Sequence, residues 1–460
     1  MQEYHQIIQN ISSLLWGLPT IMLLVGVGLF ISFITAFIQL RKFGYSLSLI
    51  SGKFDDPDDP GEISHFQALN ASLSATIGVG NIAGVGTAIA MGGPGAIVWM
   101  WLTAFLGMGL KYGECLLSLK YRIINKKGSV SAGPMYYLER GLKQKWLAIL
   151  FALFASIASL GIGNMVQANS VAATSADFFS IPKIATGLVL AFVVFLVIVG
   201  GIKRIAQVAS KMVPIMALYY VFGALFVIFL YRDHVGLAFS IIFHDAFSGT
   251  AATGGFTGAA LASTIRFGVA RGVFSNESGL GSSPIAHGAA KTKEPVREGL
   301  VAMLGPFIDT IVVCTMTALV IVLTGAYTLG EPGNGLSGAV LTATAFDMGL
   351  PGPGSFTVTV GIIFFALSTI LTWSYYGEKC LSYLVGESFV MPYRFLYCLL
   401  LPVGASMELP TVWAISDCMN ALMIWPNLVG VIFLSPVIFR ETKSYFSDPK
   451  RVYPDMYSAE

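Results

Sequence analysis

Residues 275–284 read SNESGLGSSP and interrupt a mostly apolar stretch at 261–290. Glycines that only allow close packing do not need Asn276, Glu277 and Pro284 beside them. A carboxylate inside a membrane span is energetically expensive and usually functional, and proline disrupts a helix interior. If this stretch crosses a membrane, the segment predicts a helix broken near its middle, with freed backbone lining a polar cavity.

A second segment of this kind lies at 76–84 and reads TIGVGNIAG, in a region without charged residues from 66 to 110. Glycine costs about 1 kcal/mol relative to alanine in a helix interior, so the three glycines make a weak helix. By itself the pattern also fits glycines that let helices pack closely. The matching segment at 275–284 favours a second broken helix.

The composition is that of an integral membrane protein. Only 11% of the 460 residues are charged and 55% are apolar, whereas soluble domains carry about 25% charged residues. A soluble enzyme, a nucleic-acid-binding module and a disordered chain are therefore poor interpretations. The net charge of +2 creates no field that would attract nucleic acid. The five cysteines lie in or beside apolar runs and are expected to be buried rather than paired.

Eleven stretches approach or exceed the roughly 20 apolar residues that a membrane-spanning helix needs. They are residues 16–40, 67–90, 96–120, 146–173, 184–200, 213–231, 261–290, 300–323, 356–376, 388–406 and 412–439. These runs are too long and too uniformly apolar for spanning strands. Residues 1–10 contain no Lys or Arg, so the first span is expected to be a retained helix rather than a signal peptide.

The basic residues predict how the chain is oriented in the bilayer. Most Lys and Arg residues lie in alternate loops, whereas the loops between them hold little beyond Lys183 and Arg232. Because basic loops stay in the cytoplasm, we expect a multi-pass protein of the cell (inner) membrane. Its N-terminus is predicted to lie outside and its C-terminus in the cytoplasm.

The two interrupted spans predict an inverted repeat. Without a peripheral first helix, the remaining spans divide into five plus five, and each interrupted span opens its half. An odd number of spans makes the halves face opposite ways, with a binding site at the broken helices. The predicted regions are 1–66 (N-terminus, first helix and linker), 67–231 (first repeat), 232–260 (extracellular loop), 261–439 (second repeat) and 440–460 (cytoplasmic tail).

A helix break supplies two kinds of backbone group. Freed N–H groups at a helix start suit a carboxylate, and freed carbonyls at a helix end suit a cation or an ammonium group. A zwitterionic amino acid needs both. Sodium prefers oxygen ligands, as the other hard cations do, and Ser368, Thr369 and Thr372 offer hydroxyls close together on one span. On this span alone, bonding of these hydroxyls back to their own helix is the favoured alternative.

The buried amides of Gln167 and Asn169 pose a similar choice. Both lie in an uncharged run at 146–176, and a buried amide must find a hydrogen-bond partner. That partner is either another helix or a ligand, and the sequence leaves both open.

Several motifs resemble those of the alanine or glycine:cation symporter family, across residues 67–435. The matching segments are GNIAGV at 80–85, GGPGAIVWMW at 92–101, RGVFSNESGLGS at 271–282, WSYYGE at 373–378 and PNL at 426–428. The family usually has alanine where this chain has Ser278 and Gly288. The resemblance implies an all-α, leucine-transporter-like fold of about 11 transmembrane helices, with a 5+5 inverted repeat and one extra N-terminal helix. It also implies sodium-coupled uptake of alanine and glycine, with no organic cofactor and no enzymatic activity.

The resemblance also implies roles for particular residues. Those expected at the substrate are Thr76, Gly78, Gly80, Asn81, Gln167, Phe274, Ser275, Asn276 and Trp373. Those expected at sodium are Thr76, Ser368, Thr369 and Thr372, together with carbonyls near Thr76. Trp373 is expected to close the pocket over a small side chain. A monomer is expected to suffice for transport.

Charged residues inside the spans receive structural interpretations first. Lys111 and Glu114 are three residues apart and predict a pair on one helix face. Glu277 is interpreted as a brace for the unwound backbone, with proton carriage as the alternative.

The rival functions are a proton-coupled carrier of the same fold, a channel and an amino-acid sensor. No His-Glu-x-x-His motif or Walker A sequence is present.

Overall fold

The computed structural model describes residues 11–12, 14–124, 129–248, 257–329, 336–407 and 409–452. Nearly all of the described chain is helical, and its one described sheet is a short hairpin of β1 (Ile123–Ile124) and β2 (Val130–Ser131). The expected all-α architecture is therefore confirmed.

The first part of the chain forms helices up to α12. They are α2 (Leu18–Ile34), α3 (Ile38–Arg41), α4 (Phe43–Ile50), α5 (His65–Thr76), α6 (Val85–Gly92), α7 (Ala96–Tyr121), α8 (Pro134–Tyr136), α9 (Lys145–Leu160), α10 (Val166–Phe179), α11 (Lys183–Ile198) and α12 (Gly201–Leu230). Short π-helical segments, Gly80–Gly84 and Gly161–Met165, lead into α6 and α10.

The second part repeats the pattern of a broken helix followed by long ones. Its helices are α13 (Val235–Ser248), α14 (Thr257–Asn276), α15 (Ser283–His287), α16 (Pro295–Ala302), α17 (Leu304–Pro306), α18 (Thr315–Thr324), α19 (Gly338–Gly349), α20 (Pro353–Val385), α21 (Val390–Ser406), α22 (Leu409–Phe433), α23 (Ser435–Ser447) and α24 (Pro449–Val452). A π-helical segment, Phe307–Cys314, joins α17 to α18.

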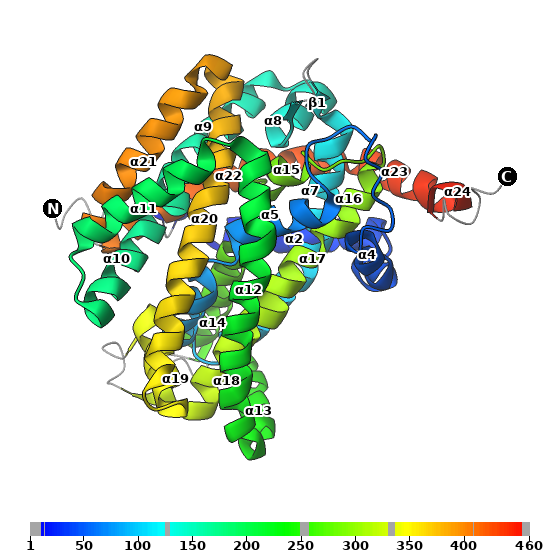
Figure 1. Ribbon diagram of the computed structural model, residues 1–460. Coiled ribbons are helices and arrows are strands. Elements are labelled where there is room, and N and C mark those ends of the chain that lie inside the picture. Colours follow the sequence, from blue (N-terminus) through cyan, green and yellow to red (C-terminus); the bar gives the residue numbers. More distant parts are fainter. Residues whose placement is uncertain are drawn as a thin grey trace.

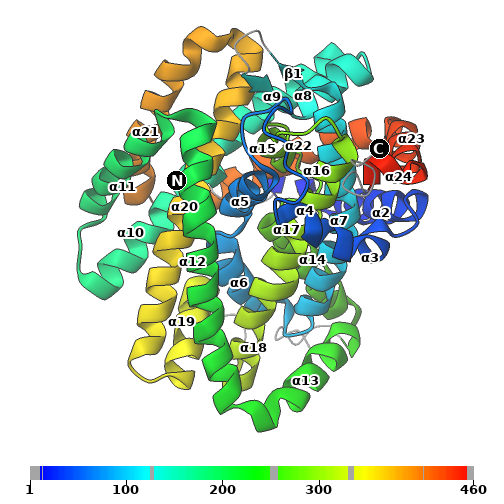
Figure 2. The ribbon, with the colours of Figure 1, turned by 45° about the vertical axis from the view of Figure 1, so that its right-hand side comes forward.

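The long helices enclose the two broken ones. In both views α12 and α20 run side by side through the bundle, α11 and α21 pair at one edge, and α23 and α24 lie at the opposite edge (Figures 1 and 2). α5 packs between α12 and α20, and α14 packs against α6 and α7. The two breaks therefore meet inside the bundle.

The first break follows from local sequence. Ser64 and Gln67 form a reciprocal capping box that starts α5. The helix ends at Thr76, and the chain resumes at Gly80 with its direction changed by 54°. π-Helical turns such as the one that follows occur often at functional sites.

The second break uses left-handed backbone conformations. Between α14 and α15, Glu277, Gly279 and Gly281 have φ angles of 55°, 86° and 78°. Glycine adopts such angles without steric cost, whereas a residue with a Cβ does so rarely. The prediction of two discontinuous helices is thus confirmed.

The count of eleven spans stays a prediction. Among the described residues six helices are long and apolar enough to cross a membrane, or up to seven if the bent pair counts as one span. α2 and α11 have only 17 and 16 residues, fewer than the roughly 20 of a straight span.

Three boundaries differ from expectation. The predicted span at 412–439 is wrong at its end, because α22 stops at Phe433 and a separate helix begins at Ser435, where Pro436 suits a helix start. The predicted loop at 232–260 contains α13, although residues 249–256 of it lie outside the described part. The segment at 324–355, which has no Lys or Arg and is predicted to be a loop between spans, contains α19, which packs on α18 and α20.

Candidate functional site

Hydroxyl groups of α20 meet the backbone of α5 at the first break. The Thr369 hydroxyl donates to the Ala75 carbonyl at 3.2 Å, and the Ser368 hydroxyl donates to the Ile77 carbonyl at 3.4 Å. In the opposite direction, Ser74 donates to the Ser368 carbonyl at 2.8 Å. Carbonyl and hydroxyl oxygens from two helices therefore converge where α5 ends.

The same hydroxyls also bond within their own helix. Ser368 and Thr369 both reach the Phe365 carbonyl, at 2.8 Å and 3.0 Å. The alternative of bonding within the helix is thus observed, alongside the contacts with the end of α5, and the role of these hydroxyls at sodium stays a prediction. Thr372 is buried, and its hydroxyl has no hydrogen-bond partner among the described residues. The Thr76 hydroxyl lies 3.4 Å from the Leu73 carbonyl of its own helix, so the carbonyls beside Thr76 are the groups that face α20.

Gly78 is the point of closest approach at this break. A Cβ there would lie 2.6 Å from the Thr369 hydroxyl and 3.7 Å from the side-chain oxygen of Gln167. Gln167 donates to the Ile162 carbonyl at 3.1 Å, while its oxygen is buried without a partner among the described residues. Gln167 therefore lies beside the break with an unused acceptor.

Asn169 has a different role from Gln167. Its amide donates to the Gly404 and Met407 carbonyls at 2.8 Å and 2.6 Å, at the end of α21. The alternative left open for this residue is resolved in favour of another helix.

The two breaks touch each other directly. A Cβ on Gly80 would lie 3.1 Å from the ring of Phe274, the residue three positions before Glu277. Because Gly80 has no side chain, the π-helical segment that leads into α6 can lie against the end of α14. The Asn81 side chain closes the same turn by accepting from the Gly78 N–H at 2.9 Å.

Asp309 links the two breaks, a role that the sequence pattern does not predict. Its carboxylate accepts from the Asn81 amide at 2.6 Å, from the Ser275 hydroxyl at 2.8 Å and from the Thr310 hydroxyl at 2.7 Å. The Asn276 amide reaches Thr310 at 3.3 Å. All of these side chains are buried. An acidic residue inside a span usually marks a functional site. Its partners could not be predicted, because they lie far away along the sequence.

Glu277 and Trp373 hold the second break against α20. The Trp373 indole N–H donates to one oxygen of Glu277 at 2.9 Å, and Ser282 donates to the other at 2.6 Å. Trp373 is fully buried against Gly163, where a Cβ would overlap its side chain. These contacts agree with the interpretation of Glu277 as a brace.

Lys111 and Glu114 also serve the second break instead of forming the expected helix-face pair. Lys111 donates to the Asn276 carbonyl at 2.7 Å. Glu114 accepts from Asn427 at 2.5 Å, and Asn427 also donates to the Gly279 carbonyl at 2.9 Å. Buried carbonyls freed by a break need donors, and here α7 and α22 provide them.

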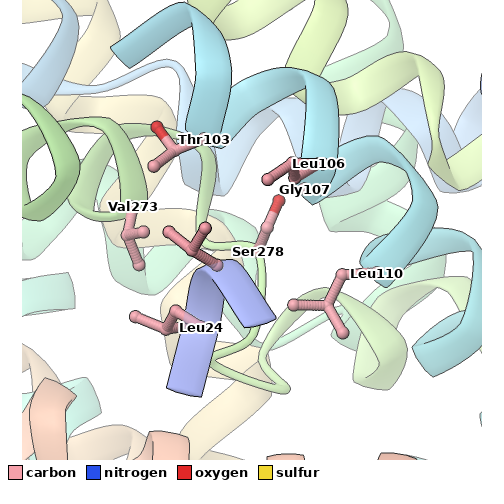
Figure 3. A pocket seen from close by; sticks show the side chains of 8 residues that line it. Leu24, Thr103, Leu106, Gly107, Leu110, Val273 and Ser278 are labelled. Carbon is pink, nitrogen blue, oxygen red and sulfur yellow. The ribbon is translucent and has the colours of Figure 1, made fainter. Parts of the chain in front are cut away.

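Two small cavities lie near these residues. The first, about 10 Å³, is lined by Leu24 of α2, by Thr103, Leu106, Gly107 and Leu110 of α7, and by Val273 and Ser278 around the second break (Figure 3). The second, about 60 Å³, lies beside the ion pair of Arg271 and Asp417, which are 3.3 Å apart. The first has room for about one water molecule. Neither is lined by the residues predicted to bind sodium, which are buried.

Two broken helices that meet inside a bundle, with polar side chains gathered at the breaks, define a membrane transporter of the leucine-transporter-like fold. The chain belongs to the sodium:alanine symporter family, whose model matches residues 1–457. It is similar to the sodium/alanine symporter AgcS of Methanococcus maripaludis, with 46% identity over 96% of this chain and 97% of that protein.

Two further comparisons bear on the family and on the fold, respectively. A putative sodium/proton-dependent alanine carrier, YrbD of Bacillus subtilis, is 35% identical over 96% of this chain and 93% of its own. A solved structure of a Na⁺-coupled sialic acid symporter, in a substrate-bound outward-open state, has a TM-score of 0.53 at 10% identity. That match covers 92% of this chain and 98% of the symporter, and it bears on the fold alone.

Proposed function

We propose that this protein carries sodium together with alanine or glycine into the cell by alternating access. One observation supports the proposal most directly. Hydroxyl groups of α20 contact carbonyl oxygens at the end of α5, beside the point where the two helix breaks touch each other. Membership of the sodium:alanine symporter family supports the coupling ion and the substrate class. The regions 67–231 and 261–439 would be the two repeats, with the N-terminus outside and the C-terminus in the cytoplasm.

The proposed sodium site lies between α5 and α20. Its ligands would be the carbonyls beside Thr76 and the hydroxyls of Ser368, Thr369 and Thr372. Oxygen ligands of this kind suit a hard cation. The unpartnered hydroxyl of Thr372 and the two hydroxyls directed at α5 carbonyls support this assignment.

The proposed substrate site lies between the two breaks. Backbone around Gly78 and Gly80 and the side chain of Asn81 would hold the carboxylate. Phe274, Ser275 and Asn276 would lie near the amino group, and the free acceptor of Gln167 supports a bond to the substrate. Close approach of the breaks at Gly80 suits a small side chain.

Sodium entry can drive such transport without ATP. A membrane potential of 100 mV is worth about 2.3 kcal/mol for each charge moved. At about 1.4 kcal/mol for each factor of ten, one sodium ion gives roughly 50-fold accumulation of alanine, before any sodium concentration gradient is added.

Uptake of labelled alanine into proteoliposomes tests the function directly. We expect uptake to require an inward sodium gradient, to stop when potassium replaces sodium at fixed pH, and to be inhibited by glycine. Internal unlabelled alanine should exchange for external label, which a channel or a sensor cannot do. Uptake that follows a proton gradient without sodium would favour the proton-coupled alternative, in which Glu277 titrates.

Replacing Trp373 tests the size limit of the pocket. Trp373→Ala should admit larger neutral amino acids as competitors of alanine uptake, or abolish uptake altogether. Trp373→Phe keeps an aromatic ring but loses the bond to Glu277, which is worth about 1.5–3 kcal/mol as a bond to a charged group. It should keep the selectivity and slow uptake roughly tenfold or more. Full activity with unchanged selectivity in Trp373→Ala would contradict a role in closing the pocket.

A further inference from the structure

One buried cluster of titratable side chains has no part in the function proposed above. His65 begins α5, His287 ends α15, and Glu298 lies on α16. The Nδ1 atom of His65 bonds to one oxygen of Glu298, and the Nδ1 atom of His287 lies 2.5 Å from the other. All three residues have 0% exposure. One carboxylate therefore joins the start of α5 to the end of α15. These two helix ends lie away from the breaks, on the side of the bundle where the basic loops are predicted.

The backbone next to this cluster is tied together as well. The Lys291 N–H donates to the Ile63 carbonyl at 2.8 Å, and the Glu62 N–H donates to the Ala289 carbonyl at 2.8 Å. Arg122 donates to four carbonyls, those of Pro60, Gly288, Ala290 and Thr292, at 2.6–2.8 Å. The segment entering α5 is thus fastened to the segment leaving α15. This side of the bundle is closed, and opening it would pull the cluster apart.

The charge of the cluster depends on its protons. If each neutral imidazole donates its Nδ1–H to Glu298, the cluster carries one negative charge. One further proton cancels that charge. Buried net charge is costly, so the closed cluster favours the additional proton. The Nε2 atoms of both histidines are buried without hydrogen-bond partners among the described residues.

Other charged or titratable groups around the cluster come from several elements. Asp55 precedes α5, and Arg297 lies beside Glu298 on α16. α7 contributes Cys115 and, at its end, Arg122. Arg122 is held by its four carbonyls. Arg297 donates to the Tyr445 hydroxyl of α23 at 3.0 Å and to the Arg451 carbonyl at 2.7 Å. Tyr376 of α20 lies near Ser72 and Ser283. Hydrogen bonds to carbonyls and to a hydroxyl leave both guanidinium groups charged. Arg122 therefore offsets part of the negative charge of Glu298, and the additional proton offsets more of it.

We propose that His65, His287 and Glu298 form a proton-binding site that holds one proton while this side of the transporter is closed and releases it when α5 moves away. The inference rests on the sodium-coupled, alternating-access function proposed above. Sodium bound between α5 and α20 would hold α5 in the same closed position. Sodium and the proton then favour one state, so by reciprocity each raises the affinity for the other.

Sodium binding to the purified full-length protein in detergent tests this linkage without regard to membrane orientation. We expect the dissociation constant for sodium to rise as the pH is raised between about 6 and 8, where histidine titrates. For one linked proton the change is at most about tenfold for each pH unit. Sodium added to weakly buffered protein should also remove up to about one proton per molecule from the medium.

Variants separate the cluster from other causes. Glu298→Gln should make sodium affinity independent of pH and abolish the proton uptake, and His287→Gln should do the same if Glu298→Gln does not fold. Glu294→Gln is the matched control, because Glu294 lies four residues earlier and pairs with Arg451 at the surface. It should keep the wild-type pH profile.

The outcomes distinguish this inference from the function on which it rests. Sodium affinity that is constant with pH, or that weakens as the pH falls, would overturn the proton site while leaving sodium coupling intact. A pH dependence that survives in both Glu298→Gln and His287→Gln would overturn it too. Absence of sodium binding at every pH would instead remove the sodium site, and this inference with it.

Discussion

Replacing Asp309 with alanine should reduce sodium-driven alanine uptake by more than about a hundred-fold. The carboxylate accepts hydrogen bonds from Asn81 at the first break and from Ser275 at the second. A buried bond to a charged group is worth about 1.5–3 kcal/mol, so loss of two exceeds the roughly 2.8 kcal/mol that corresponds to a hundred-fold change. The measurement is the initial uptake rate per amount of reconstituted protein.

The asparagine variant separates geometry from charge at this position. Asp309→Asn keeps an acceptor for the Asn81 amide, and the Ser275 hydroxyl can then accept rather than donate. It should therefore retain more activity than Asp309→Ala if the hydrogen bonds matter most. Asp233→Ala, at an exposed position, serves as a control and should transport normally. An Asp309→Ala protein that transports within about threefold of wild type, a change below 1 kcal/mol, would contradict the linking role.

The double variant Ser368→Ala, Thr369→Ala should raise the sodium concentration needed for half-maximal uptake by roughly 10- to 100-fold. Each hydroxyl interaction is worth about 0.5–1.5 kcal/mol, and each 1.4 kcal/mol is a factor of ten. Both hydroxyls lie against carbonyls at the end of α5, at Ala75 and Ile77. The sodium dependence of alanine uptake measures the effect, while the maximal rate at saturating sodium should change less.

Two variants on the same helix control this experiment. Thr369→Ser keeps the hydroxyl and should stay close to wild type. Ser374→Ala removes a hydroxyl that bonds within α20, to the Leu371 carbonyl at 2.7 Å, and should leave the sodium dependence unaltered. If the double variant responds to sodium as the wild type does, these hydroxyls do not bind the coupling ion.

Much of the fold was predictable because it depends on local properties. The scarcity of charge indicates a membrane protein, and the glycines at 76–84 and 275–284 weaken helices wherever those helices lie. Helix ends were less predictable. α22 stops before the predicted end of its span, and α13 and α19 occupy segments expected to be loops, because packing on neighbours stabilises helices that have no clear spanning pattern.

The candidate site was predictable only in part. Ser368 and Thr369 follow from hydroxyls on one helix face, and the structure brings them to the first break. Lys111 and Glu114 were assigned to each other on spacing alone, yet their bonds go to Asn276 and Asn427. Spacing along one helix describes neighbours on that helix and carries no information about a second helix packed against it.

The sequence by itself determined that this chain crosses a membrane, that two of its helices are broken, and which family its motifs resemble. Only the tertiary structure decided which side chains meet at the breaks. Asp309 and Asn81 are 228 residues apart, and Glu298 and His65 are 233 apart. Backbone preference acts within a few residues, whereas the partner of a buried charge is set by the folding of distant helices around it.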